Sequence, residues 1–142
     1  MLNNNYISLI EELNLQAHPE GGYYKETYRS DHIITTADGR KKNAATAIYY
    51  MLTDDNISQW HKVNADETWL FHQGETIEIS CKGKNGNITS TLLGNNISAG
   101  EQPQIVIAAN TWFMAKIKAQ KGYSLVTCIV APGFDFEDFE LE

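Results

Sequence analysis

From Gly22 onward the chain alternates apolar and polar residues with a period of two, and short segments of this kind are separated by turn residues. A period of two is typical of strands, because successive side chains of a strand point to opposite faces of a sheet. Turn signals such as Asp38-Gly39 and Gly94-Asn95-Asn96 recur every several residues. No segment after Gly22 has the length and period of a helix that could connect parallel strands. The sequence therefore predicts a mainly β protein, built as an antiparallel sandwich or barrel.

One helix is expected, and it precedes the strands. Apolar residues recur at helical spacing from Tyr6 to Leu13, while Glu11 and Glu12 fall on the other face, so this segment predicts a short amphipathic N-terminal helix. Strands are predicted at residues 23–30, 44–52, 57–63, 67–72, 76–82, 88–93, 104–108, 112–118 and 123–131.

Composition limits the size and the location of the protein. The 142 residues are 42% hydrophobic, which is enough for one compact domain over residues 1–142. No run approaches the ~18 apolar residues of a membrane span, and the N-terminus lacks the basic start of a signal peptide. The sequence thus predicts a soluble cytoplasmic protein without a membrane partner. Cys81 and Cys128 are too few for a disulfide framework, so we expect reduced thiols in or near strands.

The net charge of -7 is concentrated near the C-terminal end. Acidic residues gather there at Asp135, Glu137, Asp138, Glu140 and Glu142. We expect this acidic tail to be a solubilising edge. The longest basic run is Arg40-Lys41-Lys42, which we interpret as a solvated loop. Because the basic residues form no larger patch, binding to nucleic acid is not expected.

Residues 60–74 contain His61, Glu67 and Gly74 at a recognisable spacing. This spacing resembles the first metal motif of the cupins, in which His-x-His is followed by Glu and then by Gly. Val63 stands where the second histidine of that motif would be. The motif therefore implies the cupin frame without its complete set of metal ligands.

Two further blocks extend the resemblance to both ends of the chain. Residues 18–30 begin with His18-Pro19-Glu20-Gly21-Gly22 and resemble the N-terminal signature of the small single-domain cupins of the Cupin_5 type, a domain of unknown function. Residues 131–139 resemble the closing segment of that family. The resemblance implies the cupin double-stranded β-helix, a jelly-roll barrel. It also implies a homodimer and a relationship in fold to the sugar-nucleotide epimerases.

The second cupin motif is best matched by residues 108–113. Asn110 replaces a glycine, which is tolerable because asparagine readily accepts a left-handed backbone. Phe113 replaces the third histidine and cannot bind a metal. Because His61 and Glu67 alone remain of the usual ligands, we expect no metal and no other cofactor. The alternative is a metal site completed from outside the motifs by His18, Glu20 or His72.

The candidate catalytic residues are His61, Glu67 and His72. If the motif alignment holds, His61 and Glu67 point into the barrel. A histidine beside a carboxylate in a partly apolar cavity can exchange a proton near neutral pH. We therefore predict His61 as a catalytic base and Glu67 as the group that orients it or supplies a proton. His72 points inward only if a bulge before Gly74 shifts the register. The alternative is that His61 is a hydrogen-bonded structural residue of the barrel.

The residues predicted to bind a ligand are Tyr24, Glu26, Tyr28, Trp69, Phe71 and Phe113. The first three share one face of a strand, which suits a hydroxyl-rich or heterocyclic ligand. The other three offer aromatic rings for stacking. The alternative is that the tyrosines pack and Glu26 pairs with a surface cation. We interpret the preceding residues 18–22 as a turn into this strand, since proline fixes one backbone angle and the glycines permit others.

Three functions remain open. The first is a metal-independent isomerase or epimerase that acts on a carbohydrate or nucleotide-sugar-like ligand in the barrel by proton abstraction next to a carbonyl. Its weakness is that only Lys62 and Arg29 are candidates to bind a diphosphate. The second is a non-catalytic cupin that binds a small molecule, and the third is a metal-dependent cupin enzyme. Trp60 and Trp112 are predicted on the outer sheet face, where they could form the contact of a homodimer.

Overall fold

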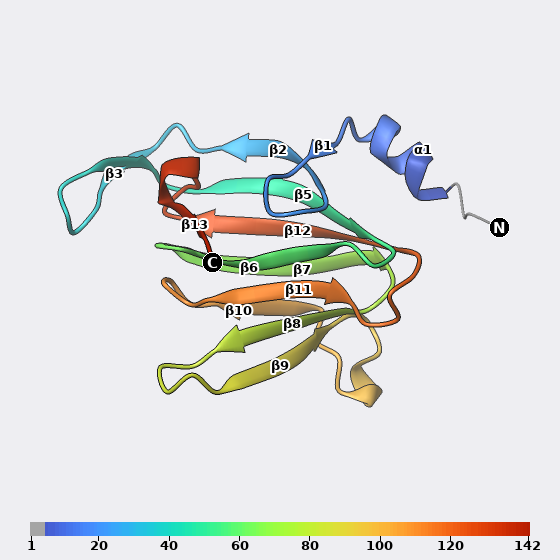
Figure 1. Ribbon diagram of the computed structural model, residues 1–142. Coiled ribbons are helices and arrows are strands. Elements are labelled where there is room, and N and C mark those ends of the chain that lie inside the picture. Colours follow the sequence, from blue (N-terminus) through green and yellow to red (C-terminus); the bar gives the residue numbers. More distant parts are fainter. Residues whose placement is uncertain (1–4) are drawn as a thin grey trace.

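The computed structural model describes residues 5–142, and residues 1–4, which open the predicted domain, lie outside this range. The chain forms two facing sheets, with a helix at one end and a small hairpin at the other (Figure 1). The six-stranded sheet contains, in spatial order, β1 (Gln16–Ala17), β2 (Tyr23–Arg29), β5 (Thr46–Thr53), β12 (Tyr123–Ala131), β7 (Asp66–Gly74) and β10 (Gln104–Ile107). The five-stranded sheet contains β13 (Phe139–Leu141), β6 (Ile57–Val63), β11 (Phe113–Ile117), β8 (Ile77–Lys82) and β9 (Ile88–Leu93). The hairpin pairs β3 (Ile33–Thr35) with β4 (Lys41–Asn43), and the helical segments are α1 (Asn5–Glu12), η1 (Ile97–Ala99) and η2 (Phe136–Asp138).

This architecture confirms the predicted fold class, a mainly β jelly-roll barrel with a short N-terminal helix. Each segment predicted as a strand contains one, and neighbouring strands within the sheets pair antiparallel. The prediction missed β1, β3, β4 and β13, which are only 2 or 3 residues long. Such strands are too short to show a period of two.

The main core lies between the two sheets and follows from the alternation along each strand. In β11, Phe113, Ala115 and Ile117 are buried, whereas Met114 and Lys116 are only partly buried. Each large apolar side chain buried in this way stabilises the fold by about 1.5–3 kcal/mol. Asn110, at the turn before β11, has a φ of +64°, which confirms the left-handed backbone expected there.

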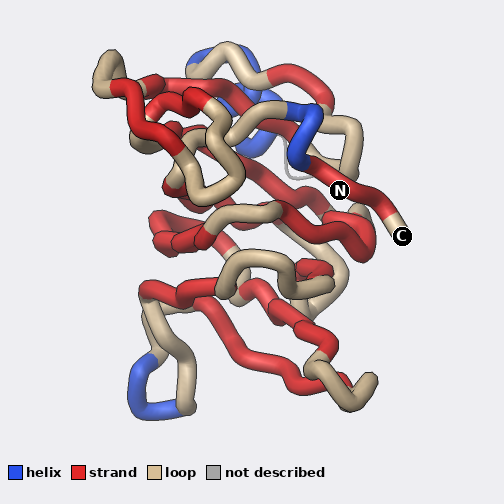
Figure 2. The backbone as a smooth tube through the Cα atoms, turned by 90° about the vertical axis from the view of Figure 1, so that its left-hand side faces the viewer, coloured by secondary structure: helices blue, strands red, loops and turns tan. Residues whose placement is uncertain are grey.

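Helix α1 covers the outer face of the six-stranded sheet, on the side away from the main core. A second cluster of buried apolar residues forms there around Met51 and Leu125, and Leu9 and Ile10 of α1 pack against it. Figure 2 shows the helical turn η1 at the opposite end of the molecule from α1 and η2. The helix therefore closes one face of a sheet and leaves the interior of the barrel to the strands.

Three β-bulges interrupt the regular alternation. Thr27 in β2 has no partner between the Ile48 and Ala47 positions of β5. Gln59 and Trp60 in β6 oppose a single residue of β11, and His72 in β7 is the extra residue opposite β12. Because a bulge changes which side chains face inward, these positions determine the composition of the barrel interior.

The sequence predicted the acidic C-terminal segment as a solubilising edge, and this holds for Glu137, Glu140 and Glu142, which are exposed, but not for Asp135 and Asp138. Asp135 and Asp138 both accept hydrogen bonds from the ammonium of Lys42, which is 5% exposed, and Arg40 Nη1 donates to Asp138 at 2.7 Å. The interpretation of Arg40-Lys41-Lys42 as a solvated loop is wrong for Lys42, because Lys41 and Lys42 belong to β4 and Lys42 is buried. These ion pairs hold the C-terminal segment against the barrel, where β13 adds a strand next to β6.

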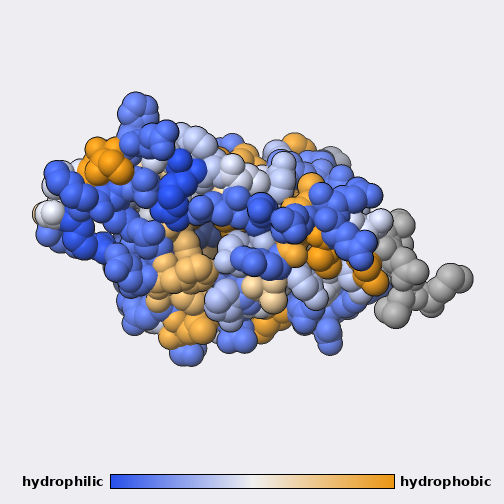
Figure 3. All heavy atoms as spheres, turned by 90° about the horizontal axis from the view of Figure 1, so that it is seen from above, coloured by the Kyte–Doolittle hydropathy of each residue, from blue (hydrophilic) through white to orange (hydrophobic). Residues whose placement is uncertain are grey.

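Within residues 5–142, no helix has the length and apolar character needed to cross a membrane. Seen from above, the surface is mostly hydrophilic, and its hydrophobic residues form separate small patches (Figure 3).

Trp60 and Trp112 lie on the outer face of the five-stranded sheet, as predicted. The ammonium group of Lys82 lies 4.5 Å from the ring centre of Trp60, and that of Lys62 lies 5.0 Å from the ring centre of Trp112.

Candidate functional site

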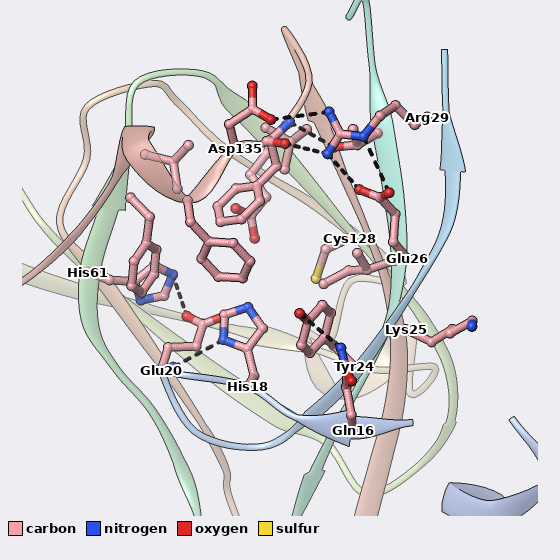
Figure 4. A pocket seen from close by; sticks show the side chains of 18 residues that line it. Gln16, His18, Glu20, Tyr24, Lys25, Glu26, Arg29, His61, Cys128 and Asp135 are labelled. Carbon is pink, nitrogen blue, oxygen red and sulfur yellow. Dashed lines mark hydrogen bonds and ion pairs between the residues drawn. The ribbon is translucent and has the colours of Figure 1, made fainter. Parts of the chain in front are cut away.

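A cavity of about 380 Å³ opens at the end of the barrel where β5 begins and β6 and β12 end (Figure 4). Its buried titratable side chains are His18, Glu20, His61, Glu67 and Cys128. Its polar rim contains Gln16, Lys25, Glu26, Arg29 and Asp135. The remaining walls are Tyr24, Thr46, Ile48, Val63, Val130, Phe134, Phe136 and Phe139. The cavity therefore joins residues of both sheets to the turn before β2 and to the C-terminal segment.

Glu20 enters this pocket through the tight turn of residues 18–22. The N–H of Gly21 donates to the carbonyl of His18 at 3.0 Å, and the N–H of His18 donates to the carbonyl of Gly22 at 2.9 Å. Gly21 and Gly22 have φ values of +108° and +79°, left-handed values that favour glycine. The turn is as predicted, and it also brings the carboxylate of Glu20, which is 6% exposed, against β6.

His61 reaches Glu20 because of the bulge at Gln59 and Trp60, which turns Ser58 and His61 to the same side of β6. The hydroxyl of Ser58 donates to Glu20 Oε2 at 2.7 Å, and His61 Nε2 lies 2.7 Å from the same oxygen. His61 Nδ1 lies 2.5 Å from the carbonyl oxygen of Gln59. A carbonyl and an ionised carboxylate can only accept hydrogen bonds. Both ring nitrogens of His61 therefore carry a proton when both bonds are made.

Glu20 and His61 form a buried ion pair. Burial alone lowers the pKa of His61, but the hydrogen bond and charge of Glu20 outweigh it and raise that pKa above its usual value. Burial likewise raises the pKa of Glu20, and the hydrogen bond and charge of His61 reverse this and lower it. Both shifts, together with the two oxygen acceptors that His61 contacts, favour an imidazolium ion at His61 and a carboxylate at Glu20. An imidazolium whose two N–H groups are both engaged is poorly suited to act as a base.

Glu67 occupies a different environment on β7, although it is also buried, at 7% exposed. Burial, followed by the negative charge of Glu20, raises the pKa of Glu67 to about 7. The positive charge of His61 and hydrogen bonds from Trp69 and Cys128 oppose this rise. Trp69 Nε1 donates to Glu67 Oε2 at 2.6 Å and holds the carboxyl in place. Glu67 can thus give or accept a proton near neutral pH.

His18 lies beside this pair as a neutral imidazole. Its Nδ1 accepts the backbone N–H of Glu20 at 3.1 Å, which assigns the ring proton to Nε2. Burial lowers the pKa of His18 and outweighs the opposite effect of Glu20. The second ring nitrogen faces the cavity (Figure 4). His18 is therefore a hydrogen-bond donor to anything that occupies the pocket.

The structure separates the three residues predicted on one face of β2. Tyr24 and Glu26 line the pocket, but Tyr28 does not and is 54% exposed. The physical reason is the bulge at Thr27, which turns Tyr28 outward and Arg29 inward. The expectation that Tyr28 lines the ligand site is therefore wrong.

Arg29 is the basic residue that this bulge brings to the pocket, and all its N–H groups are already engaged. Nη1 donates to Asn43 at 3.0 Å and to Asp135 at 3.3 Å. Nη2 donates to Glu26 and to the carbonyl of Phe134, both at 2.7 Å, and Nε donates to Glu26 at 3.3 Å. Because a guanidinium has five N–H donors, Arg29 has none left for a ligand and instead ties the C-terminal segment to β2.

The aromatic residues predicted to stack on a ligand lie in the core behind the pocket. Trp69, Phe71 and Phe113 face inward as expected, but none of them lines the cavity. Trp69 packs edge-on against Tyr50 and Phe113, and the ring centre of Phe113 lies 4.1 Å from that of His61. These side chains support Glu67 and His61 and do not reach the ligand space.

His72 lies outside the pocket, contrary to its expected place in the catalytic group. A bulge before Gly74, the condition for an inward His72, exists, yet the extra residue is His72 itself, and its side chain turns to the outer sheet face. There Nε2 lies 2.6 Å from the hydroxyl of Thr127. His72 is therefore not near enough to act with Glu67.

Sequence reasoning missed the roles of His18 and Glu20, of Cys128, and of the phenylalanines of the C-terminal segment. His18 and Glu20 lie within a motif that had already been singled out, and the signal was two titratable residues at a turn rich in glycine. For Cys128 and Phe136 the sequence carries no such signal, because only the sheet order and the C-terminal ion pairs bring them to the pocket.

The pocket donors do not fit a divalent cation as they stand. Within residues 5–142, the only His, Cys, Asp and Glu side chains that place three donor atoms within 4.8 Å of one another are Asp135, Glu137 and Asp138. Asp135 and Asp138 already bind Lys42, and both nitrogens of His61 are engaged. The pocket therefore does not fit a resident metal ion.

The raised pKa of Glu67 makes a stability prediction. A carboxyl that titrates at about 7 in the folded state and near its ordinary value of 4.5 when unfolded costs stability as pH rises between these values. We expect Glu67→Gln to match the parent protein at pH 4.5 and to exceed its free energy of unfolding by about 2–3 kcal/mol at pH 8. Urea denaturation of both proteins at the two pH values measures this. A stability difference that is the same at both pH values would contradict the assignment.

Comparison with known proteins agrees with the resemblance of residues 18–30, 60–74 and 131–139. The family described as Cupin superfamily (DUF985), Cupin_5, matches residues 7–142. An uncharacterised protein of Saccharomyces cerevisiae is 30% identical over 152 residues, which cover 92% of this chain and 71% of the yeast protein.

Solved structures support the same relationship. A hypothetical protein from Leishmania major has a TM-score of 0.90 and 33% identity, covering 100% of this chain and 88% of its own. The X-ray structure of a Shewanella oneidensis protein has a TM-score of 0.86 and 36% identity, covering 100% of this chain and 85% of its own. A mutant of Bacillus subtilis oxalate decarboxylase has a TM-score of 0.63 at 11% identity, covering 94% of this chain and 31% of that chain, and shares the fold alone.

Proposed function

This chain belongs to the Cupin_5 (DUF985) family of the cupin superfamily, and from this premise we propose its function. We propose that it is a metal-independent isomerase or epimerase that acts on a small carbohydrate-like ligand. The similar proteins of S. cerevisiae and L. major are described as uncharacterised and hypothetical, so the proposal rests on the pocket. The observation that carries it is the carboxyl of Glu67, which titrates at about 7 in the wall of a cavity.

In this proposal Glu67 is the proton-transfer group. Its pKa matches neutral pH, where a general acid or base is most effective. The two buried carboxyls of the pocket have different pKa values, because the hydrogen bond and charge of His61 lower the pKa of Glu20, whereas burial raises that of Glu67 to about 7. Such a division of pKa values is the arrangement by which acid–base enzymes assign separate roles to similar groups.

His61 has a different role from the base expected on sequence grounds. Both of its nitrogens are engaged, so it acts as a fixed positive charge near the substrate oxygen. His18 Nε2–H faces the cavity and supplies a neutral hydrogen-bond donor. Together these groups would stabilise the enolate that forms when Glu67 removes a proton next to a carbonyl.

The substrate in this proposal carries no phosphate. Arg29 has no free N–H, and the side chain of Lys25 points away from the cavity (Figure 4). A diphosphate would therefore meet carboxylates at the rim without a free cation to bind it. A volume of about 380 Å³ lies at the small end of the range for ligand pockets. The proposed substrate is therefore a small unphosphorylated sugar and not a nucleotide sugar.

The proposal predicts that Glu67→Gln lowers turnover by about 100-fold or more while the affinity for uncharged sugars changes little, since the amide keeps the shape of the carboxyl. Proton NMR in D₂O measures turnover as deuterium exchange next to the carbonyl in a panel of unphosphorylated aldoses and ketoses. Glu12→Gln, a change at an exposed glutamate of α1, is the matched control and should leave turnover unchanged. Equal turnover in the Glu67→Gln and parent proteins would overturn the role of Glu67.

The non-catalytic binding cupin is the second candidate, and the double engagement of His61 favours it, because that geometry is also what a structural histidine shows. The same NMR panel separates the two functions. Ligands that bind without deuterium exchange in the parent protein would leave the binding function and remove the isomerase.

Location and assembly are separate parts of the proposal. Cys81 and Cys128 are free thiols, as in proteins of the reducing cytoplasm, where we propose that this protein acts. We also propose a homodimer that uses the outer face around Trp60 and Trp112. Light scattering coupled to gel filtration tests it, and a monomer at micromolar concentration would rule it out.

A further inference from the structure

The charged groups that line the pocket leave a negative charge without a partner. The positive charge of His61 is balanced by Glu20 at 2.7 Å. Arg29 is balanced by Glu26 at 2.7 Å and by Asp135 at 3.3 Å. His18 is neutral. The hydrogen bonds of Glu67 come from an indole and a thiol, and the nearby positive charge of His61 is already paired with Glu20. When Glu67 is ionised, the group of Glu20, His61 and Glu67 therefore carries a net negative charge.

Aromatic rings of the C-terminal segment form one wall of the cavity. Phe134, Phe136 and Phe139 surround one another with ring centres 5.0–6.3 Å apart. Tyr24 from β2 lies 6.4 Å from Phe136 and completes the wall. The faces of such rings are negatively polarised and attract cations within about 6 Å of the ring centre.

We propose that the pocket selects a small ring-bearing ligand with an ammonium group, which binds to Glu67 between the aromatic walls. The aromatic rings and the carboxylate of Glu67 prefer the same kind of ligand, because both attract positive charge. This inference rests on the proposed function only in that the ligand occupies the pocket, and it adds that the substrate is an amine such as an amino sugar.

An ammonium ion at Glu67 would also displace the proton of that carboxyl. A positive charge within about 4–6 Å favours the ionised form of a carboxyl and lowers its pKa. Trp69 reports this change, since its indole N–H donates to Glu67 Oε2. The indole N–H signal of Trp69 therefore follows the titration of Glu67. The signals of Trp60 and Trp112 are identified with Trp60→Phe and Trp112→Phe.

Matched ring compounds test the charge of the ligand independently of sugar stereochemistry. The probes are cyclohexylamine, cyclohexanol and cyclohexanecarboxylate, titrated into the ¹⁵N-labelled parent protein at pH 7. We expect the amine to bind at least 10-fold more tightly than the alcohol, and the carboxylate to bind more weakly than both. At saturation the amine should shift the titration midpoint of the Trp69 indole signal downward by about one pH unit, which is a 10-fold change in proton affinity. The alcohol should leave the midpoint unchanged.

Glu67→Gln should remove most of the preference for the amine over the alcohol, whereas Glu12→Gln should retain it. An alcohol that binds as tightly as the amine in the parent protein would overturn the inference, whatever the variants do. Failure of the proposed isomerase is a distinct result, because it is an absence of deuterium exchange and leaves the preference for the amine intact. Failure of the inference, in turn, leaves deuterium exchange of neutral sugars intact.

Discussion

Glu20→Ala is expected to lower the free energy of unfolding by about 3–5 kcal/mol, the usual loss when one member of a buried ion pair is removed. The substitution leaves the His61 imidazolium, 1% exposed, without its carboxylate. The hydroxyl of Ser58 loses its acceptor in the same step. Chemical denaturation at pH 6 measures the loss, and a loss below about 1 kcal/mol would show that the pair is not an ion pair.

The double variant Glu20→Ala/His61→Phe provides the matched control for this prediction. It removes both charges and adds an apolar ring beside Phe113, so it should recover much of the stability lost in Glu20→Ala. If the double variant is as unstable as the sum of its single variants, the two residues are not coupled. Comparison of the parent protein, the two single variants and the double variant therefore separates the cost of an unpaired charge from the cost of lost packing.

The same pair predicts how the loss depends on pH. The pKa of His61 is raised above 6.5, so its contribution is complete below 6.5 and is lost as pH rises through the folded value. The pKa of Glu20 is lowered below 4.5, so its contribution is complete above 4.5 and is lost as pH falls through the folded value. The stability difference between the parent protein and Glu20→Ala should therefore be largest between pH 4.5 and pH 6.5 and smaller at lower and at higher pH.

Gly21→Ala is the second large effect, with an expected loss of about 3–5 kcal/mol of unfolding free energy. Gly21 has a φ of +108°, and an added Cβ would lie 2.0 Å from the carbonyl oxygen of Ile57. Because that neighbour is backbone, the turn itself must move. Movement of the turn also withdraws Glu20 from His61, so we expect the His61 pKa to fall together with the stability.

Gly86→Ala is the matched control for Gly21→Ala. Gly86 also has a positive φ, +82°, but an added Cβ there meets nothing within 4 Å. Its expected cost is about 1–2 kcal/mol, which is the strain of a left-handed residue alone. Thermal and urea denaturation of both variants give the comparison. Equal losses in the two variants would mean that the contact with Ile57 has no energetic weight.

Much of the fold could be predicted because the pattern of side chains is local. The alternation along 112–118 identifies β11 without any knowledge of its neighbours, since burial of Phe113, Ala115 and Ile117 follows from the period of two. The left-handed backbone at Asn110 is also a property of one residue and its neighbours. The antiparallel arrangement followed from the short turns between strands.

The site was predicted only in part, because its residues depend on register. Parity along a regular strand placed Glu67 inside the barrel, and it lies there. The same parity placed Tyr28 on the face of Tyr24 and Glu26, and a single bulge at Thr27 turned Tyr28 outward and brought Arg29 to the pocket. His72 was expected inside only if a bulge before Gly74 turned it inward; the bulge is present, but His72 is its extra residue and lies on the outer sheet face. A bulge adds one unpaired residue at little cost, and this sequence carries no local mark of it.

By itself, therefore, the amino-acid sequence determined the longer strands, the jelly-roll class, the family and the presence of His61 and Glu67 in the barrel. Tertiary structure decided the partner of each group. Glu20 comes from a turn 41 positions before His61 in the chain, and the charges of Lys42 and Asp135 meet across 93 positions. Protonation and ion pairing depend on distances of a few ångströms and on exclusion of water. Neither quantity is encoded in a local pattern, so the assignment of Glu67 as the titrating group required the folded barrel.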